Sequence, residues 1–305
     1  MNRVFRADRG QTMGVVAVAI TALIAMTGFV TDVGAWFRAD RHLQSVADAA
    51  ALAGAQELPE DPGKATGKAT LYIVKNSGPS TKTITFSTAT LTNDTITVKL
   101  SEQAPGFFSR VFSIDSVTVG AQASARAAKA GSVRWVAPIV VNQKNKMLSC
   151  TPPPCSGEVT LDYSDPLKGS GGPTAAGSWG FIDLGDSTGT GDSVLRDQIE
   201  NGYDGDMDLG KYSSRTGNSF GALASAFDAR IGDELLFPVY STVVKNGTIA
   251  EYTIVGWVGF VVKGYDFNGS TNTLTGYFTR VTWEGLPAAG KGGSDFGVRV
   301  ISLTN

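Results

Sequence analysis

The sequence is poor in the residues on which most catalytic and metal sites depend. Its 305 residues include one histidine and two cysteines. This set does not make a tetrahedral zinc site without several carboxylates. A serine nucleophile usually needs a histidine to accept its proton, and His42 is the only histidine in the chain. An enzyme is therefore the least favoured class of function, and no cofactor is expected.

A strong charge of either sign is also missing. The formal net charge is -2 at pH 7, so the chain has no basic field that would attract nucleic acid. No glycine-rich stretch follows the strand-loop-helix pattern with a lysine that cradles phosphates. Neither nucleic acid nor a nucleotide is an expected partner.

Long hydrophobic segments are absent except for one near the N-terminus. Residues 10–31 carry no charge. At about 1.5 Å per residue, a helix of this length crosses the roughly 30 Å hydrocarbon core of a bilayer. Arg3, Arg6 and Arg9 precede it, and the positive-inside rule places such a flank in the cytoplasm.

We therefore expect a cytoplasmic N-terminus at 1–10, a single transmembrane helix at 11–31 and an extracytoplasmic remainder. The alternative is a secretory signal cleaved at the "VGA" of residues 33–35. The length of the apolar run and a helical pattern that continues through this site favour the retained anchor.

The helical pattern extends well beyond the apolar segment. No proline interrupts it before Pro59, so one helix is predicted from about Gln11 to about Glu57. Its outer half, "SVADAAALAGA", is rich in alanine, and these small side chains let another element pack closely against it. The apolar or small residues that follow the 3.6-residue period are Val33, Trp36, Phe37, Leu43, Val46, Ala47, Ala50, Gly54 and Leu58.

Three later segments supply strands for such a cover. "KTITFS" (82–87), "DTITVKL" (94–100) and "VTVGAQASARA" (117–127) alternate with period two. They predict a small antiparallel sheet packed on the helix, a pilin-like arrangement over residues 32–131.

The helix sequence "RGQTMGVVAVAITALIAMTGFVTDVGAWFRADRHLQSVADAAALAGAQEL" resembles the N-terminal region of the Flp (Tad) pilus-assembly TadE/TadG-like family. The matching marks are the Arg-Gly-Gln entry, Asp-Val-Gly, Leu-Gln and the Ala-Asp-Ala-Ala-Ala-Leu-Ala-Gly run. The resemblance covers about residues 6–58 and, more loosely, extends to 130. It implies a subunit or accessory factor in a bacterial cell membrane, with other Tad pilus or secretion components or pilin-like subunits as partners.

The sequence departs from this family's pattern in two places. A prepilin-peptidase substrate has glycine before the cut and glutamate at the fifth mature position, whereas Val15 stands there if Gly10 is the glycine. The D-x-S-x-S metal motif of the von Willebrand A domains in some relatives is absent. Metal-dependent adhesion of that type is not expected.

A face of small residues runs along the predicted transmembrane helix. Small side chains let a second helix approach closely, so this face is a candidate helix-packing site. The alternative is an alanine-rich anchor that faces lipid. The face consists of Gly14, Ala17, Thr21, Ala25 and Gly28.

Residues 132–305 predict an all-β domain with two short helices, "SVLRDQIENGY" and "SFGALASAFDARIG". The Asn-Gly pairs in "KNGT" (245–248) and "FNGS" (267–270) favour hairpin turns. In "CTPPPC", three prolines stiffen a short loop, so a Cys150–Cys155 disulfide is predicted in an oxidising compartment. Two free thiols in a turn are the alternative.

Two polar motifs in this domain resemble functional sites. "GNSFG" places Ser219 in a G-x-S-x-G string, but without a histidine partner it is read as a loop that starts a helix. "DGDMDLG" begins like an EF-hand loop, but Arg215 stands where that loop has glutamate. Solvated turn aspartates are the favoured interpretation over a weak calcium site, whose candidate ligands are Asp204, Asp206 and Asp208, with Asp183, Asp186 and Asp192 nearby.

The sequence thus predicts an α+β protein. A long transmembrane helix continues outside the membrane, packs on a small antiparallel sheet and is followed by an all-β C-terminal domain. The favoured function is non-catalytic, as a membrane-anchored pilin-like protein of Flp/Tad pilus assembly. The alternative is a membrane-anchored adhesin or ligand-binding β domain unrelated to pilus building.

Overall fold

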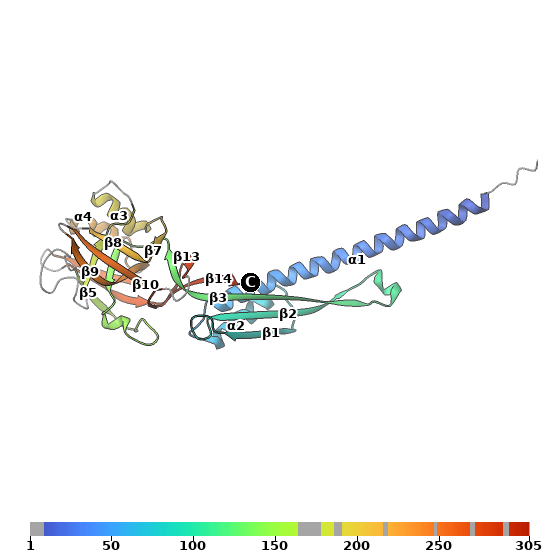
Figure 1. Ribbon diagram of the computed structural model, residues 1–305, viewed down its shortest axis with the longest axis horizontal. Coiled ribbons are helices and arrows are strands. Elements are labelled where there is room, and N and C mark those ends of the chain that lie inside the picture. The colour runs from blue at the N-terminus through green and yellow to red at the C-terminus, as the bar shows by residue number, and fades with distance from the viewer. Residues whose placement is uncertain are drawn as a thin grey trace, which may run out of the picture. The chain divides into compact units, whose positions relative to one another are not determined.

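The computed structural model describes residues 9–163, 178–185, 191–215, 219–246, 249–268, 272–288 and 293–304. The chain forms two compact units (Figure 1). The first comprises Met1–Arg126 with Leu303–Asn305, and the second Ala127–Ser302. A long apolar helix is followed by a mostly β remainder, so the predicted α+β class is confirmed.

The first unit is built on α1, which spans Arg9–Ala55 as the uninterrupted helical pattern predicts. The C-terminal half of α1 packs against a second helix and against a strand of a small sheet. The other elements of this unit are α2 (Pro62–Lys75), β1 (Lys82–Ser87), β2 (Thr95–Pro105), the 3-10 helix η1 (Ser109–Phe112) and β3 (Ser116–Val133), which continues into the second unit.

Helix α2 is not among the elements predicted from the sequence. Asp61 caps the helix by accepting a hydrogen bond from the backbone N–H of Lys64 at 2.8 Å, and proline stands in the first turn. Ala65, Ala69 and Ile73 are buried on one face. These positions are four residues apart, which is the spacing of one helix face.

The predicted antiparallel sheet of the first unit is present. β1 pairs with β2 from Lys82 opposite Leu100 onward, and β2 pairs with β3 as far as Pro105 opposite Ser116. Beyond that pair, residues 106–115 close the β2–β3 hairpin and include η1; we call them the hairpin tip.

The second unit contains a closed ring of six strands in the order β10-β11-β5-β6-β4-β9 and back to β10, with β8 paired to both β10 and β6. The pairs β4–β9 and β5–β6 are parallel and the other four antiparallel. The strands are β4 (Ile139–Asn142), β5 (Val159–Tyr163), β6 (Ser178–Ile182), β8 (Gly210–Arg215), β9 (Glu234–Asn246), β10 (Ile249–Phe267) and β11 (Asn272–Thr279).

A second, smaller set of strands surrounds the end of β3. Val133 pairs with both β13 and β7, while β14 lies beside β3 and pairs in parallel with β12. Two α-helices fall where the sequence predicts them. The remaining elements are η2 (Lys146–Leu148), α3 (Asp192–Asn201), β7 (Met207–Asp208), α4 (Phe220–Asp228), β12 (Val281–Thr282), β13 (Gly285–Pro287) and β14 (Val298–Thr304).

Large aromatic side chains fill the core of the second unit. Trp179 is 1% exposed and its ring lies edge-on to Phe181, Phe220 and Phe227. Phe237 of β9 stacks on Phe260 of β10 at 4.9 Å between ring centroids. Edge-on and offset ring pairs of this kind add to the free energy gained by burial.

Candidate functional site

The N-terminal half of α1 presents an apolar surface that the rest of the described chain leaves largely uncovered. The segment has a mean hydropathy of 2.3 in its most apolar window, and the helix is long and apolar enough to cross a membrane. Among its side chains, Met13 is 78% exposed and Val18 71% exposed. Burial begins where the hairpin tip meets the helix.

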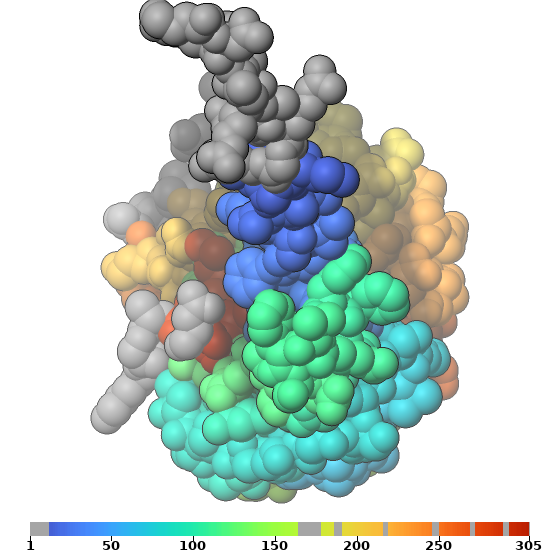
Figure 2. Space-filling view, turned by 90° about the vertical axis from the view of Figure 1, so that its right-hand side faces the viewer, coloured from blue at the N-terminus to red at the C-terminus, as the bar shows by residue number. Residues whose placement is uncertain are grey.

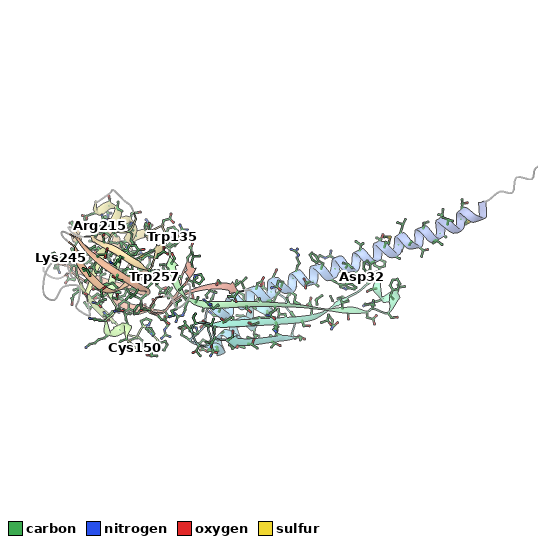
Figure 3. All side chains as sticks on the ribbon, in the orientation of Figure 1. Asp32, Trp135, Cys150, Arg215, Lys245 and Trp257 are labelled. Carbon is green, nitrogen blue, oxygen red and sulfur yellow. A yellow bond between two sulfur atoms is a disulfide. The ribbon has the colours of Figure 1, made fainter. Side chains whose placement is uncertain are left out.

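Asp32 makes the polar contact between α1 and the hairpin tip (Figure 3). Its carboxylate accepts hydrogen bonds from the backbone N–H of Phe107 at 2.9 Å and of Ser109 at 2.6 Å. The side chain is 2% exposed. Because Ser109 opens η1, the carboxylate satisfies N–H groups that a helix start leaves without intrahelical partners. Asp32 thus holds a turn that lies 75 residues further along the chain.

The electrostatics of Asp32 follow from these donors. Burial acts to raise the pKa of the carboxyl, but the backbone N–H groups of Phe107, Ser109 and Phe108 outweigh it, so the pKa lies below its usual value of 3.8. Asp32 is therefore ionised at neutral pH. Its charge is met by peptide dipoles of the tip.

Glycine allows the tip to approach the helix backbone just before Asp32. A Cβ atom at Gly28 would lie 2.5 Å from Cγ of Phe108, far inside contact distance, so Phe108 rests directly on the helix. Figure 2 shows the tip, in green, against the blue helix. A groove of about 580 Å³ opens beside this contact. It is lined by Thr21, Ile24, Ala25 and Phe29 of α1 and by Val111, Phe112 and Ile114 of the hairpin.

These contacts give the predicted small-residue face two environments. Gly28 lies under Phe108, and Thr21 and Ala25 line the groove. At Gly14, no other element of the described residues comes within 4 Å of the place that a Cβ atom would take, and the carbonyl of Ala17 accepts a hydrogen bond from Thr21 Oγ1. Packing of a second helix on this face stays a prediction.

Further along α1, two polar side chains bind the backbone of the hairpin strands. Trp36 Nε1 donates to the carbonyl oxygen of Pro105 at 3.2 Å. Gln44 Nε2 donates to the carbonyl oxygen of Gln122 at 3.1 Å. Together with Asp32 they attach one side of the helix to β2, the tip and β3.

The alanine-rich stretch of α1 is also packed closely against its neighbours. A Cβ atom at Gly54 would lie 2.6 Å from Ile96 Cδ1 and 3.1 Å from the backbone oxygen of Ala65. Neighbouring elements therefore pack closely on the alanine-rich half of α1, as the sequence predicts. The buried hydrophobic residues between positions 43 and 58 are Leu43, Val46, Ala47, Ala50, Ala51, Ala53, Ala55 and Leu58.

Residues 10–57 match the Tad family, described as Putative Flp pilus-assembly TadE/G-like. No curated protein and no solved structure matches the chain. The Tad match ends before α2, and it contains Asp32, Trp36 and Gln44. The segment that carries the family pattern is therefore the helix that holds the hairpin. In the sequence, Asp32 stands out only as part of the Asp-Val-Gly motif and as the first charged residue after the charge-free run of residues 10–31.

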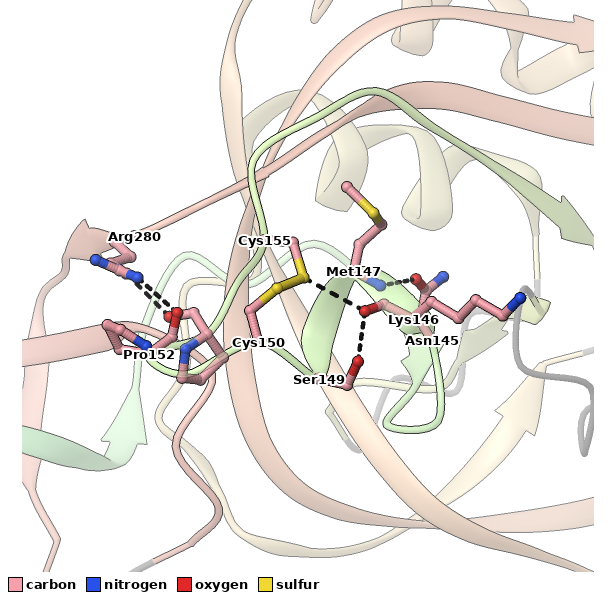
Figure 4. The surroundings of a disulfide bond; sticks show 9 residues. Asn145, Lys146, Met147, Ser149, Cys150, Pro152, Cys155 and Arg280 are labelled. Atoms are coloured by element: carbon pink, nitrogen blue, oxygen red, sulfur yellow. Dashed lines mark hydrogen bonds between the residues drawn. A yellow bond between two sulfur atoms is a disulfide. The ribbon is translucent and has the colours of Figure 1, made fainter.

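The disulfide predicted in the second unit is present between Cys150 and Cys155 (Figure 4). Its loop is attached to its surroundings by Arg280, whose Nη2 donates to the carbonyl of Pro152 at 2.6 Å and whose Nε donates to Pro153 at 3.0 Å. The disulfide therefore braces a loop and leaves no free thiol in the chain.

Two of the three calcium candidates, Asp204 and Asp206, form ion pairs with Arg134. Asp204 Oδ1 is 2.5 Å from Arg134 Nη2, and Asp206 Oδ1 is 3.7 Å from Arg134 Nε. Asp208 lies in β7, and Asp186 lies outside the described residues. Within the described ranges, no group of three or more histidine, cysteine, aspartate or glutamate side chains is placed to hold a metal ion.

Ser219 precedes the first residue of α4, as expected for a loop that starts a helix. Its backbone N–H donates to Asp192 Oδ2 at 3.3 Å. Gly217 and Asn218 of the same string lie outside the described residues. His42 is an exposed residue of α1, in the other unit.

Proposed function

We propose that this protein is a membrane-anchored, pilin-like structural or accessory protein of Flp/Tad pilus assembly that acts by association and not by catalysis. The observation that carries the proposal is the Tad match over residues 10–57, which coincides with the helix that is both apolar enough to span a membrane and packed on the small sheet. The contacts between α1, the hairpin tip and the sheet support a role in association.

In the proposed topology, residues 1–10 lie in the cytoplasm, 11–31 cross the membrane, and residues 32–131 and 132–305 lie outside. The arginines before the apolar run support this orientation. The disulfide supports it as well, because disulfides persist in oxidising compartments. Partners would be pilin-like subunits or other components of the pilus machinery.

The test is complementation of a strain that lacks the gene. The wild-type chain should restore Flp pili, counted by electron microscopy, and should cross-link to pilus components. Ala19→Arg with Leu23→Arg places two charges in the apolar span, each at about 2.5–3.5 kcal/mol on the insertion scale, so this variant should leave the membrane fraction and restore no pili.

The matched control places two arginines on the same helix outside the span, at the exposed residues His42 and Ser45. This control should remain in the membrane and restore pili. Unchanged pilus number in the strain without the gene would show that the assembly role is wrong.

A further inference from the structure

The hairpin tip is apolar and exposed, which is unusual for a turn that faces water. Phe107 is 76% exposed, Val111 82% and Phe112 71%. Contiguous exposed apolar side chains mark a binding surface for a protein or a membrane. The tip continues the uncovered apolar surface of α1, because Phe112 lines the same groove as Ile24 and Phe29.

The tip also lies at membrane depth if α1 spans the bilayer as proposed above. Phe108 rests on Gly28, and the groove extends along the helix to Thr21. From Thr31, where the charge-free run ends, back to Thr21 is about 15 Å of helix, or half of a roughly 30 Å hydrocarbon core. The tip and the helix therefore share one leaflet.

Six backbone N–H groups of the tip donate hydrogen bonds within the first unit, which favours a segment that lies in lipid. In hydrocarbon, each peptide group needs a partner within the protein. Phe107 and Ser109 donate to Asp32. The other bonds run within the tip: Gly106 N–H to Asp115 O at 2.9 Å, Val111 N–H to Phe108 O at 3.1 Å, Ser113 N–H to Arg110 O at 2.9 Å, and Ile114 N–H to Ser109 O at 3.1 Å.

The charges of the tip agree with an interfacial position. Between Gly106 and Ile114, Arg110 is the only charged residue. An arginine can leave its stem in the apolar layer while its guanidinium reaches the headgroup phosphates. Asp115, the next charge, lies at the base of the tip, where its carbonyl pairs with Gly106.

We propose that the hairpin tip is a second membrane contact, inserted beside α1 into the leaflet on the side of the folded units, with lipid acyl chains filling the groove. The proposal rests on the membrane placement of α1 and requires no pilus component. Lipid is the occupant because the patch continues the exposed apolar surface of the helix and because backbone N–H groups of the tip bond to Asp32 and to one another. A second copy of α1 would fill the same groove and is a competing outcome of the test.

The experiment uses the full-length protein in vesicles of phosphatidylethanolamine and phosphatidylglycerol. Both native cysteines are in the disulfide, so an introduced cysteine can be spin-labelled selectively. Val111→Cys tests the tip. Val18→Cys, 71% exposed, is the control within the span, and Val74→Cys, 68% exposed on α2 of the same unit, is the control outside it. The accessibility of each spin label to oxygen and to a polar nickel complex is measured with the nickel complex present on both sides of the vesicle membrane.

The label at Val111 should have a ratio of oxygen to nickel accessibility clearly above that at Val74, as the label at Val18 does, because water is scarce in the hydrocarbon layer. A Val111 label as open to nickel as Val74 would overturn the proposal while Val18 still supports the anchor. Low accessibility of Val111 to both reagents would mean that protein covers the tip, which also overturns it. An aqueous reading at Val18 would overturn the anchor and the tip together.

Discussion

The two units bury their helices and strands with side chains of opposite kinds. The first packs α1 through alanines and glycines, and its backbone approaches neighbouring elements closely, as at Gly54. The second fills its ring of strands with tryptophan, tyrosine and phenylalanine. The first core should therefore suffer from added volume and the second from lost volume, since overpacking and cavity formation are different failures.

The largest expected effect is truncation of the aromatic core. Trp179→Ala should lower the free energy of unfolding of the second unit by about 3–5 kcal/mol, the usual range for a buried aromatic residue. Trp135→Ala removes the same side chain where it is 38% exposed and should destabilise clearly less. Urea unfolding in detergent, followed by the fluorescence of the remaining tryptophans, measures both. Equal losses would contradict the proposed dependence on core volume.

The reverse change probes the first unit. Ala50 is 0% exposed on the packed half of α1, so Ala50→Leu should destabilise the unit by about 1–3 kcal/mol through overpacking. His42→Leu adds apolar volume at an exposed position of the same helix and should change stability by less than about 0.5 kcal/mol. Faster tryptic cleavage at Lys64 and Lys68 of α2 reports the loss. If both variants are cleaved alike, the close packing of the alanine stretch is not what stabilises the unit.

Acid should destabilise the first unit through Asp94, which lies in the turn between β1 and β2. Burial acts to raise the pKa of Asp94, but the backbone N–H groups of Leu91, Thr90 and Ala89 outweigh it and lower the pKa from 3.8 to about 2. The pKa of Asp94 is lower in the folded chain than in the unfolded chain. Its ionised carboxylate therefore stabilises the first unit above about pH 4, and this contribution is lost as the pH falls towards 2.

The lowering of the pKa from 3.8 to about 2 corresponds to about 2.5 kcal/mol at about 1.4 kcal/mol per pKa unit, and solvent screening reduces the expected effect to about 1–2 kcal/mol. Asp94→Asn should weaken the first unit at pH 7 and flatten its loss between pH 4 and pH 2. Hydrogen exchange of peptides from β1 and β2 measures this. An unchanged acid slope in the variant would assign the effect to other carboxyls.

The smallest effect is expected to stay local. Asp32→Ala removes the acceptor for the N–H groups of Phe107 and Ser109, so exchange of these amides should accelerate by roughly tenfold, as for a lost hydrogen bond. Asp40→Ala removes an exposed carboxylate from the same helix and should leave the tip unchanged. Mass spectrometry of peptides spanning 105–115 resolves the two. Acceleration in both variants would remove the special role of Asp32.

The parts of this fold that the sequence predicts are those with a local period. The 3.6-residue pattern of α1 and the alternation of β1 and β2 are visible over a dozen residues and were confirmed. Helix α2 was not predicted, because its signal is a cap and three buried residues in a glycine-containing segment.

Nonlocal contacts lay beyond the reach of a single sequence. The hydrogen bond from Phe107 to Asp32 joins positions 75 residues apart. Strand β11 pairs with both β10 and β5, and nothing in the sequence of β11 indicates the second partner. Asp204, in the string that resembles a calcium loop, likewise forms an ion pair with Arg134, which lies 70 residues away in the sequence. Such partners are set by the tertiary structure and not by spacing.

The position of Asp32 also sets an order of events during folding. The carboxylate is synthesised before its donors at 107 and 109, so these two hydrogen bonds form only after the hairpin has been made. Closure of the hairpin then fixes the tip at one level of α1, and the register between hairpin and helix is set by a single side chain.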